Sequence, residues 1–213
     1  MRLAALWMLA CLTAPVAGLA QGARAAAGDT SAPPALPPIS AAATLAAVLP
    51  MQAAGFSRGG LTDFESRPGG QGLGAAADYR PSDGSGGVAT VYRYSRGLAG
   101  LPEGTASPAV EHELQSALAE IRAVAPLRRY GLAGLAEAPP IPAPDGQPAL
   151  RCLAMLLAYE GGTRTADSFV CVGVLQGQFL KLRLTLPTEH QGDGQPRLLA
   201  LGRALVAALV KAG

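Results

Sequence analysis

Apolar and polar residues alternate in several stretches of this chain, and the alternation predicts β-strands in its last third. Three apolar runs follow one another over residues 149–159, 167–176 and 178–186, each as long as an ordinary strand. In the last run every second residue from Leu180 to Leu186 is a leucine, which indicates one buried face. The first two runs are apolar on both faces, so other elements must cover the sheet on each side.

Turn-forming residues separate the three runs and predict their register. A two-residue turn at 176–177 pairs Leu182 with Cys171, and a turn centred on 161–162 pairs Cys171 with Cys152. A two-residue loop at 161–162 would place the cysteines at a hydrogen-bonded pair, where Cα atoms lie farther apart, whereas a four-residue loop gives the other parity. We predict a disulfide between Cys152 and Cys171. The alternative is two buried free thiols on the core face.

Two amphipathic segments are the predicted covers of this sheet. Residues 108–124 keep apolar side chains at helical spacing, with Ser107 as the N-cap, Pro108 at the first helical position and Pro126 marking the end. Residues 196–211 place leucines at the same spacing, and this segment is too short and too polar for a membrane helix.

Three further strands are predicted upstream of the first helix. Aromatic and β-branched residues concentrate over 88–95, its expected partner is 74–80, and another strand is expected near 60–66. The predicted fold class is therefore α+β, with an antiparallel sheet of five to seven strands packed by two main helices.

The N-terminal 20 residues have the pattern of an export signal. Arg2 precedes an apolar run, and the small residues Gly18 and Ala20 lie just before Gln21. We predict a signal peptide over residues 1–20 and a periplasmic or secreted protein, with no stable membrane span after cleavage. The alternative is an uncleaved anchor. A lipoprotein signal at Cys11 is not supported, because an apolar stretch follows it where a polar tether is expected.

Two predicted regions follow the signal. Residues 21–54 are expected to form an Ala/Pro-rich linker and a short helix, and residues 55–213 a single α+β domain. Removal of the signal leaves Cys152 and Cys171, and an even pair in an exported protein favours a disulfide over a metal site.

The net charge limits the classes of partner that this chain is expected to bind. Seventeen Lys and Arg against 15 Asp and Glu give a net charge of +2, so the chain has no large basic or acidic field. We therefore expect neither nucleic acid nor an anionic lipid surface as a partner. We also predict no metal, no cofactor and no catalytic residue.

Few residues are candidates for chemistry. Tyr92, Arg93, Tyr94 and Arg96 could form an aromatic and basic surface for a ligand or a partner, although the two tyrosines could instead pack under a helix. His112 resembles the start of a zincin helix, but Ser116 occupies the place of the second histidine, and His112 falls on the polar face of its helix.

The second histidine, His190, lies in a polar loop, and no Gly-x-Ser-x-Gly nucleophile motif accompanies it. A hydrolase would need one of the two histidines to converge with an acid or a nucleophile in one pocket.

Four short motifs carry a resemblance to known proteins: Ala-Asp-Tyr-Arg at 77–80, Val-Tyr-Arg-Tyr at 91–94, Leu-Pro-Glu-Gly at 101–104 and Phe-Leu-Lys-Leu-Arg at 179–183. With the order of the predicted elements, they resemble an uncharacterised family of exported proteins of Gram-negative bacteria, over roughly residues 55–187. The layout is also similar to the PsbP-like α+β fold. This resemblance implies an antiparallel sheet packed against helices and assigns no activity and no catalytic residue.

The function predicted from the sequence is that of an exported envelope protein without enzymatic activity. It would be a binding, accessory or scaffold module, and its partner would be an envelope protein or a small ligand. The alternative is a periplasmic hydrolase that uses His112 or His190.

Overall fold

The computed structural model describes residues 40–188 and 194–213. In chain order the elements are α1 (Ala41–Val48), β1 (Gln52–Ala53), β2 (Phe56–Asp63), β3 (Ala75–Pro81), β4 (Val88–Tyr94), α2 (Pro108–Arg128), β5 (Tyr130–Pro142), β6 (Pro148–Tyr159), β7 (Arg164–Leu175), β8 (Gln178–Pro187) and α3 (Gly194–Ala212). The described strands form one antiparallel sheet of eight strands in the order β1-β2-β3-β4-β8-β7-β6-β5. The protein thus has the predicted α+β class.

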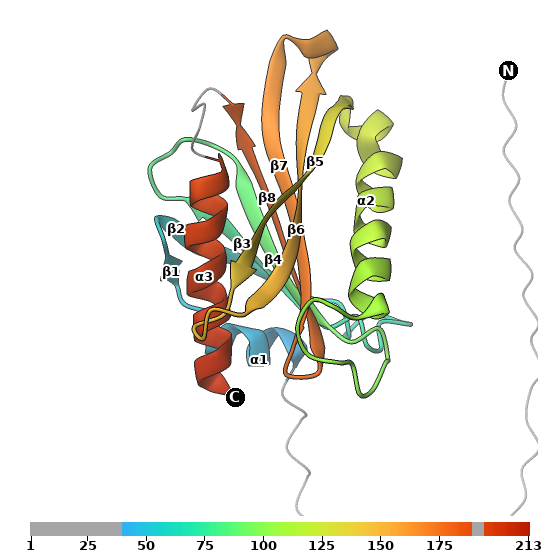
Figure 1. Cartoon of the computed structure of the whole chain (residues 1–213), viewed down its shortest axis with the longest axis vertical. Helices are drawn as coiled ribbons and strands as arrows, with labels where there is room; N and C mark the ends of the chain where they lie inside the picture. Colours follow the sequence, from blue (N-terminus) through green and yellow to red (C-terminus); the bar gives the residue numbers. More distant parts are fainter. Residues whose placement is uncertain (1–39, 189–193) are drawn as a thin grey trace, which may run out of the picture. The chain divides into compact units, whose positions relative to one another are not determined.

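The helices cover the two faces of the sheet (Figure 1). Helices α1 and α3 lie on one face and α2 lies on the other. The apolar residues divide accordingly into two buried clusters. Alternate residues of β8 illustrate the division, since Leu180, Leu182 and Leu184 belong to the α1 and α3 side, whereas Phe179 belongs to the α2 side. Most of β6 and β7 is buried on both faces, as the apolar pattern of these strands indicated.

The predicted register of β6, β7 and β8 is confirmed. Leu182 pairs with Cys171, and Cys171 pairs with Cys152. Tyr159 pairs with Arg164, so the loop between β6 and β7 has four residues. The two cysteines form a disulfide, and their Cα atoms are 4.0 Å apart, as expected of a close, non-hydrogen-bonded antiparallel pair.

The predicted number of strands was too low, because β1 and β5 have no strand signal in the sequence. Strand β5 is rich in Gly and Ala and contains Pro139, Pro140 and Pro142. It lies at the edge of the sheet, where a missing backbone N–H costs no ladder hydrogen bond on the outer side. Strand β1 has only two residues, Gln52 and Ala53, and pairs with the start of β2.

The short helix expected within residues 21–54 is present as α1, and it packs against the sheet as a third helix beside the two main ones. Leu45 and Leu49 are 1% and 3% exposed and join the cluster under α3. Packed structure therefore begins before Gly55, the start expected for the domain. Helix α2 continues past Pro126 and ends where Arg129 takes the left-handed conformation.

The predicted signal peptide, Cys11 and most of the predicted linker lie outside the described residues. No helix in the described part of the chain is long and apolar enough to cross a membrane.

Candidate functional site

A groove lies beside α2, where the helix leaves part of the sheet uncovered. Helix α2 packs over β5, β6 and β7, and the α2-side face of β4 and β8 remains accessible next to it. The cavity has a volume of about 580 Å³, which lies within the usual range for small-molecule sites. Its lining residues are Val88, Thr90, Tyr92, Val124, Arg128, Tyr130, Tyr159, Arg183 and Thr185.

A second cavity of about 390 Å³ adjoins the first, near the start of β7 and the end of β8. The two share Val88, Tyr159 and Thr185 in their walls. Hydroxyl groups dominate the polar lining of the second cavity, which includes Thr163, Thr165, Thr185 and Thr188. Together the two cavities form one groove with a wider and a narrower lobe.

The pairing of β4 with β8 builds the floor of the wider lobe. Thr90 pairs with Arg183, and Tyr92 pairs with Lys181. These residues share one face of the sheet because alternate residues of a strand point the same way. Burial raises the pKa of the Tyr92 hydroxyl, and the positive charge of Arg183 partly opposes this rise.

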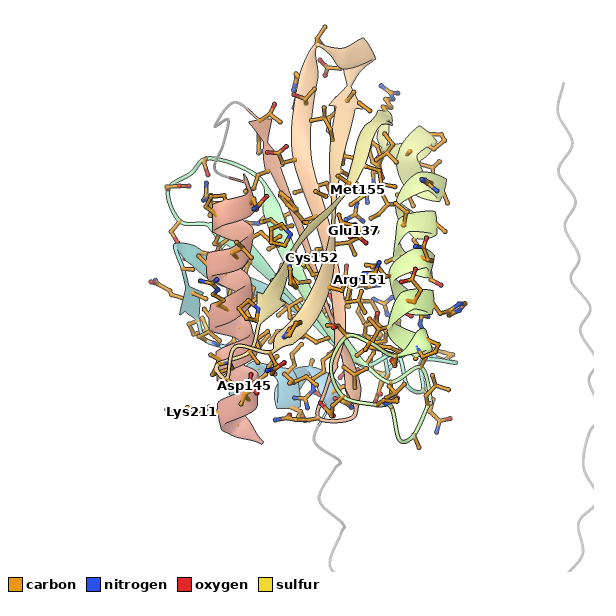
Figure 2. All side chains as sticks on the ribbon, viewed as in Figure 1. Glu137, Asp145, Arg151, Cys152, Met155 and Lys211 are labelled. Carbon is orange, nitrogen blue, oxygen red and sulfur yellow. A yellow bond between two sulfur atoms is a disulfide. The ribbon has the colours of Figure 1, made fainter. Side chains whose placement is uncertain are left out.

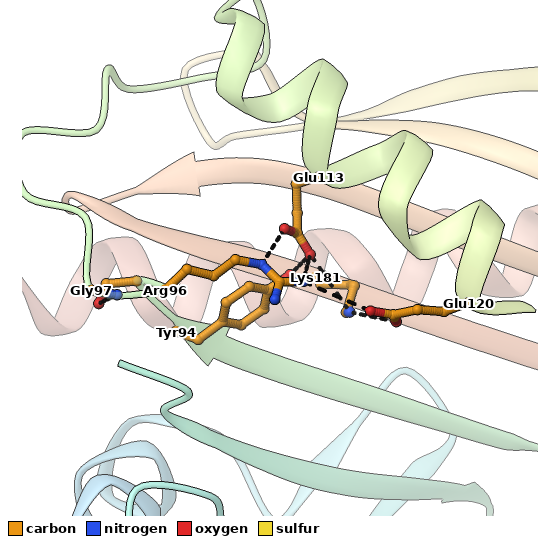
Figure 3. Close-up of polar contacts among 7 residues, drawn as sticks. Tyr94, Arg96, Gly97, Glu113, Glu120 and Lys181 are labelled. Carbon is orange, nitrogen blue, oxygen red and sulfur yellow. Dashed lines mark hydrogen bonds and ion pairs between the residues drawn. The ribbon is translucent and has the colours of Figure 1, made fainter. Parts of the chain in front are cut away.

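A network of charged side chains adjoins the groove along α2 (Figure 3). Glu113 is 1% exposed, and its carboxylate accepts hydrogen bonds from Arg96 Nε at 2.5 Å and from Arg96 Nη2 at 2.8 Å. The hydroxyl of Tyr94 donates to the same carboxylate at 2.6 Å. Lys181 Nζ lies 3.8 Å from Glu113 and 3.7 Å from Glu120. Two acids and two bases are therefore matched in this network.

The network keeps Glu113 ionised. Burial alone would raise the pKa of its carboxyl, but the hydrogen bonds from Arg96 and Tyr94 and the charges of Arg96 and Lys181 outweigh burial, and the pKa is lowered. Burial and the hydrogen bond to Glu113 raise the pKa of Tyr94, so its hydroxyl stays protonated as a donor. The arrangement fixes the loop after β4 to α2.

A second ion-pair cluster holds the other side of α2. Arg151 of β6 contacts Glu111 of α2 and Glu137 of β5, the latter at 2.8 Å (Figure 2). Ion pairs therefore join α2 to the sheet on both sides of the helix. They hold in place the helix that forms one wall of the groove.

The four residues predicted to form an aromatic and basic surface are divided by the structure. Tyr92 lines the groove, whereas Tyr94 and Arg96 are used in the Glu113 network. Arg93 points to the opposite face of the sheet, where its guanidinium donates to Gln176 at 2.7 Å. The strand pleat separates it from its neighbours, since side chains alternate across the sheet.

Of the two candidate histidines, His112 lies within the described residues. His112 is exposed on α2, as its position on the polar face of the helix predicted, and shares a shallow depression with Arg96, Ser116 and Glu120. His190 lies outside the described residues. No group of three or more potential metal ligands occurs in residues 40–188 and 194–213.

Sequence reasoning missed Glu113 and most of the groove. Glu113 lies three residues after Val110 and next to Leu114, so it falls on the apolar face of α2. An acidic residue on the apolar face of a helix was the signal in the sequence for a buried carboxylate that needs a polar partner. Arg183 gave a weaker signal, as a cation on the alternate face of a leucine-rich strand. No local pattern relates it to Arg128, because the two come from distant parts of the chain.

Comparison of the sequence with protein-family models finds no matching family, and comparison with curated proteins finds no similar sequence.

Proposed function

We propose that this protein is an exported, non-enzymatic binding module whose small-molecule ligand occupies the groove between α2 and strands β4 and β8. The observation that carries the proposal is the groove itself. It has about 580 Å³ of space in its wider lobe, and its aromatic and polar side chains come from α2, β4, β5, β6 and β8. Such concave surfaces, apolar with a few convergent polar groups, are typical of ligand sites.

Export to the periplasm or beyond is part of the same proposal. The N-terminal pattern of residues 1–20 supports it, and so does the disulfide between Cys152 and Cys171. Disulfides persist in oxidising compartments and are rare in the bacterial cytosol. The uncharacterised family of exported Gram-negative proteins and the PsbP-like layout remain resemblances that agree with this proposal.

Amide-detected NMR can test the groove as a binding site. The probes are a naphthalenesulfonate and the matching neutral naphthalenesulfonamide. Binding of either probe should shift the amide signals of Thr90, Tyr159 and Thr185 more than those of residues outside the groove. Val88→Trp should abolish the shifts, because Val88 lies where the two lobes meet.

Ala200→Trp is the matched control, since Ala200 is exposed on α3 at the opposite face of the sheet. It should leave probe binding unchanged. Shifts confined to residues outside the groove, or equal binding by the Val88→Trp variant, would refute the proposed site. If the tryptophan variant does not fold, the amide shifts of the wild-type protein still show whether the probe binds in the groove.

A further inference from the structure

We propose that the ligand of this groove is a small organic anion, with a flat apolar or aromatic body and one oxyanion group such as a carboxylate, sulfonate or phosphate. The inference rests on the proposed function and adds the chemical class of the ligand. It follows from the way in which two arginines and three tyrosines surround the wider lobe: Arg128, Arg183, Tyr92, Tyr130 and Tyr159.

The two arginines supply the positive charge. Arg183 enters from β8 and Arg128 from the last turn of α2, so they approach the cavity from two elements. The ion pairs recorded for residues 40–188 and 194–213 use Arg96, Arg151, Arg164 and Arg197, and include neither Arg128 nor Arg183. A guanidinium presents a planar fork of donors that matches an oxyanion.

Asp78 and Glu120, the acids whose charges act on Tyr92 in the groove, have other partners. Asp78 accepts a hydrogen bond from the Thr90 hydroxyl at 2.9 Å. It lies two strands away from Arg183 in one cross-strand row, which is about 10 Å between Cα atoms. Glu120 lies 3.7 Å from Lys181 and 3.8 Å from Arg96. The wider lobe therefore has an excess of positive charge, and an anionic ligand complements it.

The tyrosines supply the apolar walls. The rings of Tyr130 and Tyr159 meet edge to face with their centroids 5.6 Å apart. The Tyr130 hydroxyl donates to the carbonyl of Ile121 at 2.6 Å, so its ring is held in place on α2. Tyr92 lies in the same cavity, on β4. Fixed aromatic faces favour a flat ring system over a bare inorganic ion.

The polar lining of the narrower lobe indicates how the ligand is oriented in the groove. Its arginine, Arg164, pairs with Glu160 at 3.2 Å, and the rest of its polar lining is mainly threonine hydroxyl. This lobe therefore suits an uncharged polar part of the ligand. The anionic group belongs in the wider lobe, between Arg128 and Arg183.

Titrations with the two naphthalene probes, at low and at raised NaCl concentration, test the ligand class. The sulfonate should bind at least about tenfold more tightly than the sulfonamide, since hydrogen bonds to a charged group are the stronger ones. Raised salt should weaken only the sulfonate. Arg183→Gln should remove most of this preference while leaving sulfonamide binding intact, and Arg183→Lys should keep part of it.

Arg122→Gln is the control, because Arg122 is exposed on α2 and does not line the groove. Equal affinity for the two probes, both mapped to the groove, would overturn the anionic class and leave the proposed binding function in place. Failure of both probes to shift groove amides would overturn the binding function and this inference with it. A sulfonate preference that survives Arg183→Gln would also contradict the assignment.

Discussion

A carboxylate buried on the apolar face of a helix loses its water, and Glu113 replaces that water with three side chains. Arg96 contributes two hydrogen bonds and Tyr94 one, while Lys181 adds a positive charge. None of these partners belongs to α2, so the network joins the helix to β4, its following loop and β8. Its contribution is to position α2, which forms one wall of the groove.

Replacement of Glu113 by Gln should destabilise the protein at neutral pH. The glutamine carbonyl can keep the hydrogen bonds from Tyr94 and Arg96 Nη2, but the variant loses the bond from Arg96 Nε and the negative charge of the carboxylate, at a cost of about 2 kcal/mol. For a domain of this size the melting temperature should fall by about 4–8 °C. Calorimetry of Glu113→Gln beside the exposed control Glu65→Gln measures the effect.

The same variant should show a particular dependence on pH. The pKa of Glu113 is lowered from its ordinary value of 4.5, so the folded state binds this proton less tightly than the unfolded state. Its contribution to stability is therefore complete above pH 4.5 and is lost as the pH falls through the lowered pKa. The gap in melting temperature between the wild type and Glu113→Gln should narrow in acid. A gap that stays constant with pH would contradict the ionised assignment.

At the scale of elements, the hairpins β6–β7 and β7–β8 form the centre of the fold. Their turns are short, so each strand meets its neighbour immediately in the chain, and the register follows from the turn. The four-residue loop places Cys152 and Cys171 directly opposite each other beneath α3, where they are 1% and 0% exposed. The disulfide therefore joins two strands that already pair.

Loss of this disulfide should lower stability without changing the fold. The bond spans a sequence separation of 19 residues, and constraint of the unfolded chain over such a loop contributes about 3 kcal/mol. Reductant should lower the melting temperature of the wild type but not that of a variant carrying Cys152→Ala and Cys171→Ala. Labelling of two thiols in unfolded, unreduced protein would show that the bond is absent.

At the scale of the whole molecule, helices cover the two faces of the sheet to different extents. Helices α1 and α3 cover one face with a large apolar cluster. Helix α2 covers only part of the other, and the polar residues of β4 and β8 remain accessible beside it. A rigid core on one side and a groove on the other agree with the binding module that we propose.

The exported form should begin at Gln21 or within a few residues of it. Arg2, the apolar run and the small residues before Gln21 fit a signal that is cleaved there. N-terminal sequencing of protein from the periplasm measures the cleavage site. Limited proteolysis should then trim the Ala/Pro-rich segment and stop before α1, because Leu45 is buried in the core. Intact Met1 in a membrane fraction would contradict cleavage.

The parts of the fold that depend on neighbours along the chain could be predicted from the amino-acid sequence. Helix α2 has its Ser107 cap and apolar spacing, and the pairing of Cys152 with Cys171 follows from the short loop between β6 and β7. The sequence did not reveal β5, whose Gly, Ala and Pro residues form a strand because β6 offers a free edge to pair with.

The groove and the Glu113 network arise instead from contacts between distant parts of the chain. Both depend on the pairing of β4 with β8, which places Thr90 beside Arg183 and Tyr92 beside Lys181. These strands are about 90 residues apart in the chain, and no turn connects them, so their register comes from packing of the whole core. Side chains that meet only through long-range pairing leave no local pattern, and for that reason the site was visible only once the sheet was complete.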